Sequence, residues 1–200
     1  LDPLVEQIPC QVDDAGSIAT LVRACAGDPG PIHVHVAEQT DEVDDCLAAI
    51  GLRPIDWLAQ HAALDARWQL VHATHATPGE IDAVAHSGAG IVICPSTEAN
   101  LGDGIFPAQE FLASNGAFGV GSDSHVSVSA LEELRWLEYG QRLKHQQRNL
   151  VAGAKQPDVG TQLLADAAAG GWQASGVEAR DDRIELDGNA PALFGASATD

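Results

Sequence analysis

The stretch Pro31-Ile-His-Val-His-Val-Ala-Glu-Gln39 decides the fold that we expect for this chain. Apolar, β-branched residues alternate with two histidines from Ile32 to Ala37, which is the period-two pattern of a β-strand. Amphipathic helical stretches follow from Asp41 to Ala49 and from Ile55 to Leu64. The chain therefore contains a strand–helix unit here.

The same unit repeats further along the chain. Three more strands are expected, at Trp68 to Ala73, Gly90 to Cys94 and Ala117 to Gly121. The helices that follow them are expected from Thr77 to about His86, from Pro107 to Ser114, from Ser129 to His145 and from Val159 to Ala169. Strands that alternate with helices predict an α/β fold with a parallel sheet.

Two of these helices carry more detailed expectations. The buried side of the helix from Ser129 to His145 is expected to be formed by Leu131, Leu134, Leu137 and Tyr139. The last helix is expected to end at Gly170-Gly171, because glycine commonly terminates helices.

Composition excludes several classes of protein. The 200 residues are 45% hydrophobic, enough to bury a sizeable core, and carry a formal net charge of −19. Such a charge repels nucleic-acid phosphates and anionic lipids, so neither is an expected partner. No apolar run is long enough for a transmembrane helix, and the start does not resemble a signal peptide. The cysteines form no Cys-x-x-Cys motif and are expected to be buried thiols in a reducing cytoplasm: Cys10, Cys25, Cys46 and Cys94.

Polar residues follow each of the four expected strands where the strand ends. They are His35 with Glu38, His72 with His75, Ser96-Thr97-Glu98, and Asp123 with Ser124 and His125. His35 and Asp123 lie 88 positions apart over three strand-to-strand steps. That is about 29 residues per step, against about 31 in a (β/α)8 barrel, whose reactive groups lie at these strand ends. An open, doubly wound sheet would show the same local pattern, so both architectures stay open at this point.

Histidine and carboxylate side chains at strand ends suit a catalytic zinc ion, which takes about three protein ligands and one water. We predict His35 and Asp123 as two of those ligands. Glu38, three residues after His35, is the expected proton carrier between the water and a leaving nitrogen. His72 is expected to orient the attacking oxygen or to stabilise charge at the attacked carbon.

Simpler interpretations compete with these roles. A single histidine at a strand end is more often an ordinary hydrogen-bonded residue, and His33 shares a strand face with His35. The role of His75 is open between support and structure, while His125 is expected to support the site. The acidic run from Asp41 to Asp45 is expected to be a solvated first helical turn. No Gly-x-Gly-x-x-Gly motif follows a strand, so a nucleotide cofactor is not expected.

Longer words of the sequence resemble the amidohydrolase superfamily and, within it, the formimidoylglutamate deiminase family. The order His-x-x-Glu, His and Gly-Ser-Asp-Ser is similar to the residues that follow barrel strands five, six and eight in the mononuclear deaminase branch. The stretches with the greatest likeness to the family are His33–Gln39, Leu70–His75, Ser96–Gly104, Gly121–Val126 and Glu132–Arg142. The uninterrupted stretch Ser96–Gly104 is far more specific to the family than scattered histidines and aspartates are.

The resemblance implies a partial (β/α)8 barrel of the amidohydrolase type, about strands five to eight, at residues 16–175. Residues 176–200 would begin a small C-terminal β-sandwich segment, with one strand from Arg183 to Leu186. Residues 1–15 are unmatched.

The function implied is the zinc-dependent hydrolysis of N-formimidoyl-L-glutamate, a small-molecule substrate, to N-formyl-L-glutamate and ammonia in histidine degradation. His35 and Asp123 would bind one zinc ion per site, with Asp123 able to act also as a base. Glu38 would carry protons and His72 would assist the attacking water. Members of the family are generally dimers, so a homodimer is expected here, in the cytoplasm that the cysteines indicate.

The sequence also departs from the family. The family adds a His-x-His pair from the first barrel strand and a His-Ser-x-Arg stretch before the fifth, and residues 1–15 match neither. We therefore expect the 200 residues to be part of a longer chain and to be nearly inactive alone. Two alternatives remain: another amidohydrolase deaminase, acting on guanine, adenosine or cytosine compounds, and a non-catalytic remnant.

Overall fold

A computed structural model describes residues 4–7, 15–151, 158–179, 185 and 187–191 of the chain. The strand expected from Arg183 to Leu186 lies, apart from Glu185, outside the described residues. Cys10 also lies outside them.

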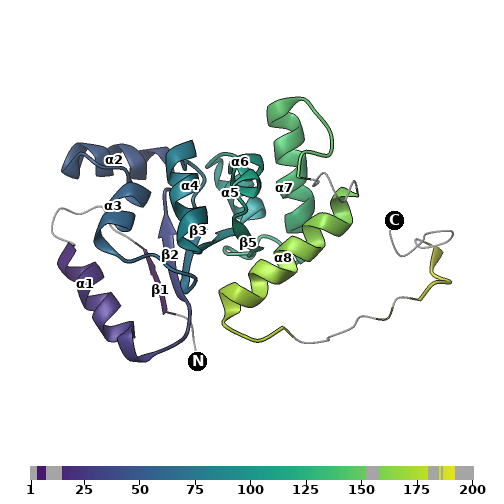
Figure 1. The fold of residues 1–200 in the computed structure, drawn as a ribbon. Coiled ribbons are helices and arrows are strands. Elements are labelled where there is room, and N and C mark those ends of the chain that lie inside the picture. Colours follow the sequence, from purple (N-terminus) through teal and green to yellow (C-terminus); the bar gives the residue numbers. More distant parts are fainter. Residues whose placement is uncertain (1–3, 8–14, 152–157, 180–184, 186, 192–200) are drawn as a thin grey trace.

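The centre of the fold is one parallel sheet of five strands in the order β1-β2-β3-β4-β5 (Figure 1). The strands are β1 (Leu4–Gln7), β2 (Ile32–Val36), β3 (Trp68–His72), β4 (Gly90–Ile93) and β5 (Ala117–Val120). Each strand pairs in parallel with the next along the chain. The four expected strands are confirmed, and β1 is an additional strand from a segment where none was expected. Because all strands run the same way, their C-terminal ends meet at one edge.

Helices connect and cover the strands. They are α1 (Ala15–Ala24), the short 3-10 helix η1 (Cys25–Gly27), α2 (Thr40–Ile50), α3 (Pro54–His61), α4 (Pro78–Ser87), α5 (Pro95–Leu101), α6 (Ala108–Ala113), α7 (Ala130–His145) and α8 (Val159–Ser175). Figure 1 shows α1 to α3 on the left of the strands and α7 and α8 on the right. None of the helices in the described ranges is both long and apolar enough to cross a membrane.

The expected alternation in β2 is confirmed by burial. Ile32, Val34 and Val36 are at most 3% exposed and lie in the hydrophobic core, whereas His33 and His35 are half-buried. One face of β2 therefore contributes apolar side chains to the core, and the other carries the two imidazoles.

All four expected strands end one residue early, and at β2 and β3 the backbone turns at that point. Ala37, His72 and Ala73 have φ angles of 51°, 68° and 48°. For a residue with a Cβ, this left-handed conformation costs roughly 1–2 kcal/mol. Such strain concentrates where surrounding structure holds a functional segment in place. Here the left-handed residues change the direction of the backbone at the C-terminal ends of β2 and β3.

The buried side of α7 differs from the expectation. Leu134 and Leu137 are buried as predicted, but Leu131 is 65% and Tyr139 is 50% exposed. The other buried positions on this helix are polar, at Glu133, Glu138 and Gln141. Each is hydrogen-bonded to backbone, which makes its burial tolerable. A count of apolar periodicity could not detect a buried face built in this way.

The predicted end of the last helix at Gly170-Gly171 is wrong, because α8 continues to Ser175. A Cβ on Gly170 would lie 1.9 Å from the carbonyl oxygen of Phe118 in β5, so glycine lets the helix rest directly on the strand. Packing of α8 on β5 therefore outweighs the low helix propensity of glycine. The helix ends at Gly176, whose φ is 63°.

This contact predicts opposite effects for two neighbouring alanine substitutions. Gly170→Ala should destabilise the protein by about 2–3 kcal/mol, because the new methyl group meets backbone that cannot move aside. Gly171→Ala is the matched control, since a Cβ there meets nothing within 4 Å; it should stabilise by up to about 1 kcal/mol through helix propensity. Urea unfolding of both variants measures the difference. Equal unfolding midpoints would contradict the close packing.

Candidate active site

Three metal-binding side chains gather at the C-terminal edge of the sheet. His35, His72 and Asp123 each offer one ligand atom, and these atoms lie within 4.8 Å of one another. His35 lies in β2, His72 is the last residue of β3, and Asp123 lies three residues beyond β5. The register places His72 beside Val36, one residue beyond His35. The group is thus assembled from the ends of three strands.

The approach of His35 to Asp123 requires a curved sheet. Strands β3 and β4 lie between β2 and β5. In a flat sheet, three spacings of about 4.8 Å would separate β2 from β5 by roughly 14 Å. Yet His35 Nε2 lies 3.8 Å from Asp123 Oδ1. A curl of the strands toward a common axis, as in part of a barrel, together with the reach of the turn after β5, accounts for this approach.

The site has a buried floor and a more open side. The side chain of His72 is 1% exposed, whereas those of His35 and Asp123 are 18% and 31% exposed. The rings of His35 and His72 lie 5.3 Å apart between centroids, tilted by 43°. A ligand can therefore approach from the side of His35 and Asp123, while His72 is enclosed by protein.

Glu38 lies beside His72, with its Oε1 3.6 Å from His72 Nε2. The turn that carries it is held by Glu42 of α2, whose carboxylate accepts the backbone N–H groups of Ala37 and Glu38 at 2.7 and 2.9 Å. The expectation that the acidic run was merely a solvated helical turn is therefore wrong for Glu42. All four residues predicted from the sequence, His35, Glu38, His72 and Asp123, lie in one place.

The pKa values of both Glu38 and His72 are raised, but for different reasons. For Glu38, burial is the main cause; His72 opposes it, and the negative charges of Asp103 and Asp123 add to it. Burial alone would lower the pKa of His72, but the hydrogen bond to Glu98 and the charges of Glu38, Glu98 and Asp123 outweigh it. Both groups thus hold protons more readily than they would in water.

Two contributors to the site received no role from sequence reasoning, although Glu98 was among the polar residues noted at the strand ends. Glu98, in the short helix α5, is 3% exposed and its Oε1 lies 3.3 Å from His72 Nδ1. Asp103 lies close enough to Glu38 for its negative charge to raise the pKa of that carboxyl group. A signal for α5 was present, since Pro95 suits the first turn of a helix. No sequence signal links Asp103 to Glu38.

The other candidate residues lie outside the central group. His33 Nε2 contacts the carbonyl oxygen of Ala174 at 2.8 Å, so this histidine fastens the end of α8 to β2. His125 is exposed. His75 packs against Gly104, where an added Cβ would lie 3.4 Å from its ring. His33 therefore has the role of an ordinary hydrogen-bonded residue. Neither His75 nor His125 belongs to the cluster of three metal-binding side chains.

Cys94 follows β4 close to the site, but its thiol is no candidate nucleophile. Burial, together with the negative charge of Glu98 and other nearby carboxylates, raises its pKa far above the usual range. A thiol reacts as its thiolate, so Cys94 is inert near neutral pH. This agrees with the expectation of a buried, unreactive cysteine.

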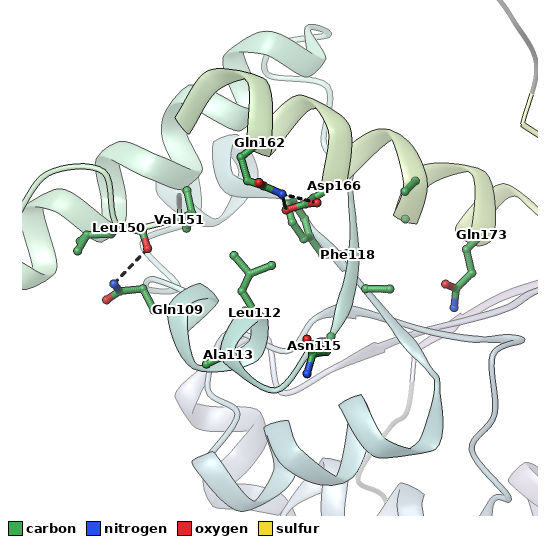
Figure 2. A pocket seen from close by; sticks show the side chains of 14 residues that line it. Gln109, Leu112, Ala113, Asn115, Phe118, Leu150, Val151, Gln162, Asp166 and Gln173 are labelled. Atoms are coloured by element: carbon green, nitrogen blue, oxygen red, sulfur yellow. Dashed lines mark hydrogen bonds between the residues drawn. The ribbon is translucent and has the colours of Figure 1, made fainter. Parts of the chain in front are cut away.

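A hollow of about 630 Å³ lies away from these residues, between α6, β5 and α8 (Figure 2). Several of its polar side chains are already paired. Gln162 donates to Asp166, and Gln109 donates to the carbonyl oxygen of Leu150. None of the four site residues lines it. The hollow therefore offers no convergent set of chemical groups, and the strand ends remain the candidate site.

Comparison with known proteins identifies the family. Residues 13–156 match the model of the amidohydrolase family, and the chain belongs to that family. It is 55% identical over 186 residues to formimidoylglutamate deiminase of Pseudomonas aeruginosa, an alignment that covers 90% of this chain and 41% of that protein. It is 32% identical over 166 residues to 5-methylthioadenosine/S-adenosylhomocysteine deaminase of Natronomonas pharaonis, covering 83% of this chain and 38% of that protein.

Solved structures agree on the fold. The chain resembles a crystal structure of an amidohydrolase from Brucella melitensis with a TM-score of 0.78 and 45% identity, over 82% of this chain and 36% of that one. An adenosine deaminase from Xanthomonas campestris with bound zinc matches with a TM-score of 0.73 over 87% of this chain and 38% of that one. At 23% identity, the second match concerns the fold alone. The chain spans about two fifths of the length of these relatives, and its fold is part of the amidohydrolase barrel.

The geometry predicts which side chains bind the metal ion and which do not. His35→Ala and Asp123→Ala should each weaken zinc binding by more than about a hundredfold, because loss of a ligand exceeds the 10–100-fold effect of losing an outer partner. Matched controls are His33→Ala on the same strand and His125→Ala in the same turn, which should change zinc affinity less than about threefold. Chelator competition measures all four. Weaker binding in the controls than in the ligand variants would contradict this site.

Proposed function

We propose that the protein containing these 200 residues hydrolyses N-formimidoyl-L-glutamate to N-formyl-L-glutamate and ammonia, using one zinc ion. The observation that carries the proposal is the gathering of His35, His72 and Asp123 within 4.8 Å, with Glu38 beside them. The 55% identity to formimidoylglutamate deiminase, over 90% of this chain, supports the choice of substrate. Because the chain covers 41% of that relative, the activity is proposed for the whole protein.

The residues fit a zinc ion by their chemistry and by one buried atom. Imidazole nitrogen and carboxylate oxygen are both preferred zinc ligands. His72 Nε2 is buried without a hydrogen-bond partner and faces the region between His35 and Asp123. We assign His35 and Asp123 as ligands. When bound, zinc supplies a water molecule whose pKa is lowered to about 7, and therefore a nucleophile near neutral pH.

The protein side chains would then manage protons and charge. Oε1 of Glu38 accepts a proton from the attacking water as a C–O bond forms at the amidine carbon. The same carboxyl group passes this proton to the imine nitrogen. The second proton of the water, now on the hydroxyl of the tetrahedral carbon, is then carried to the same nitrogen, the C–N bond breaks, and neutral ammonia leaves N-formyl-L-glutamate. The raised pKa of Glu38 favours this role, because the group must hold a proton between the two steps. Nε2 of His72 orients the attacking oxygen, and Asp123 can serve as a further base.

Deaminases of aromatic bases are the second candidate. The relatives include an 8-oxoguanine deaminase, 38% identical over 117 residues, and the methylthioadenosine deaminase already described. A third candidate is a chain that packs against other protein without catalysis. The higher identity to the deiminase favours the linear amidine.

Further features of the proposal are a cytoplasmic location, a homodimer, and no nucleic-acid or membrane partner. The net charge of −19 supports the last of these, because it repels phosphates. The cytoplasmic location derives from the widely spaced cysteines, and the homodimer from the family resemblance.

Ammonia release separates the three candidates. With the protein at full natural length and loaded with zinc, only N-formimidoyl-L-glutamate should release ammonia among that compound, guanine, adenosine and cytosine. Glu38→Gln should lower kcat by about 10²–10⁴-fold while zinc content stays unchanged, since it removes proton transfer but no ligand. Asp41→Asn, an exposed acid on α2, is the control. Release from an aromatic base would favour the second candidate, and release from none would favour the third.

A further inference from the structure

The first turn of α5 contains three consecutive buried polar residues to which the proposed mechanism gives no role. Ser96, Thr97 and Glu98 are 6%, 0% and 3% exposed. Burial of polar side chains is unfavourable unless they are hydrogen-bonded. Each of the three binds a different part of the structure, and two of those parts carry residues of the candidate site.

Glu98 contacts the side of His72 that faces away from Glu38. Its Oε1 accepts the N–H group of Cys94 at 2.9 Å and lies 3.3 Å from His72 Nδ1. A carboxylate accepts hydrogen bonds and donates none, so this contact places the imidazole proton on Nδ1. Nε2 is then left to face Oε1 of Glu38, 3.6 Å away. The contact determines both the tilt of the ring and the nitrogen that it presents.

Thr97 contacts the turn that carries Asp123. Its Oγ1 lies 2.9 Å from Ser124 Oγ and accepts the N–H group of Ser124 at 3.2 Å. The same hydroxyl is 3.3 Å from the carbonyl oxygen of Ser122. Asp123, between these two serines, has a φ of 39°, a conformation that is uncommon for residues with a side chain but that aspartate adopts more readily than most.

Ser96 connects this turn of α5 to the long helix α7. Glu133 accepts the backbone N–H of Ser96 at 2.8 Å and its hydroxyl at 2.6 Å. Glu133 is itself 1% exposed, so the pair is shielded from water. This contact anchors the first turn of α5 to α7, and the two residues that follow Ser96 contact the site.

We propose that the first turn of α5 is a positioning element for the site. Glu98 holds the ring of His72 with its proton on Nδ1, and Thr97 holds the turn that places Asp123 against His35. The catalytic consequence rests on the proposed function, in which His72 orients the attacking oxygen and Asp123 binds zinc. The structural consequence can be measured without any turnover.

Substitution of Glu98 tests the first contact in the zinc-loaded, full-length protein. Glu98→Gln keeps an oxygen that accepts from Nδ1, so the His72 tautomer should persist and kcat should fall less than about tenfold. Glu98→Met removes the acceptor, so ring-15N histidine NMR should show the proton redistributed between Nδ1 and Nε2. We expect kcat for Glu98→Met to fall about 10–100-fold, with KM changed less than about threefold.

Glu138→Gln is the matched control, because this buried carboxylate accepts the N–H groups of Leu150 and Val151 and no contact joins it to His72. It should lower the melting temperature and leave the His72 tautomer unchanged. An unchanged tautomer in both Glu98 variants overturns the proposal even if the amidine is hydrolysed. If the amidine is not hydrolysed, the proposed function fails, and the NMR result still decides whether Glu98 positions His72.

Substitution of Thr97 tests the second contact. Thr97→Val removes the hydroxyl at nearly constant volume and should weaken zinc binding about tenfold or more, whereas Thr97→Ser should remain close to the parent protein. Thr74→Val is the control, since the hydroxyl of Thr74 is buried with no hydrogen-bond partner among the described residues. Chelator competition measures the affinities. Equal zinc affinity in Thr97→Val and Thr74→Val would overturn the role of Thr97.

Discussion

The curvature of one parallel sheet is the constraint on which the site depends. Side chains from β2 and from the turn after β5 approach within 3.8 Å, although two strands lie between them. Parallel pairing sends every C-terminal end to the same edge, and the curl of the strands then brings those ends together. A single residue shift in the register of β2 would move His35 to the core face and replace it with an apolar side chain. The fold and the site are therefore specified by the same alternation.

Buried polar contacts, rather than apolar packing alone, hold the loops behind the site. On α7, Glu133 holds the start of α5, Gln141 holds the carbonyl oxygen of Phe106, and Glu138 holds Val151. Hydrogen bonds of this kind demand one geometry, because a buried group left without its partner is costly. Apolar contacts tolerate sliding, whereas these contacts do not. Helix α7 thus fixes the segments after β4 and the segment that follows α7 itself, without reaching the reacting groups.

Sequence reasoning predicted the parts of the structure that depend on a regular period. The strands from β2 to β5 follow from alternation and from runs of β-branched residues, and residues 35, 38, 72 and 123 follow from their places at strand ends. The strand β1 was missed because its residues, Leu-Val-Glu-Gln, form neither an alternating pattern nor an apolar run. The buried acids of α7 were missed because their partners lie far away in sequence. Gly170 misled because its role depends on the backbone of Phe118.

The site combines one rigid residue with two more accessible ones, and this division has a physical reason. His72 lies between the carboxylates of Glu98 and Glu38, at 3.3 and 3.6 Å, and is almost fully buried. An imidazole in that position cannot rotate without losing a charge-assisted hydrogen bond in a region of low dielectric. His35 and Asp123 are partly exposed, which leaves room for a ligand to enter and leave. Under the proposed function, orientation would be determined on the buried side and ligands would exchange on the open side, an arrangement that suits a hydrolase which must bind water and substrate afresh in every cycle.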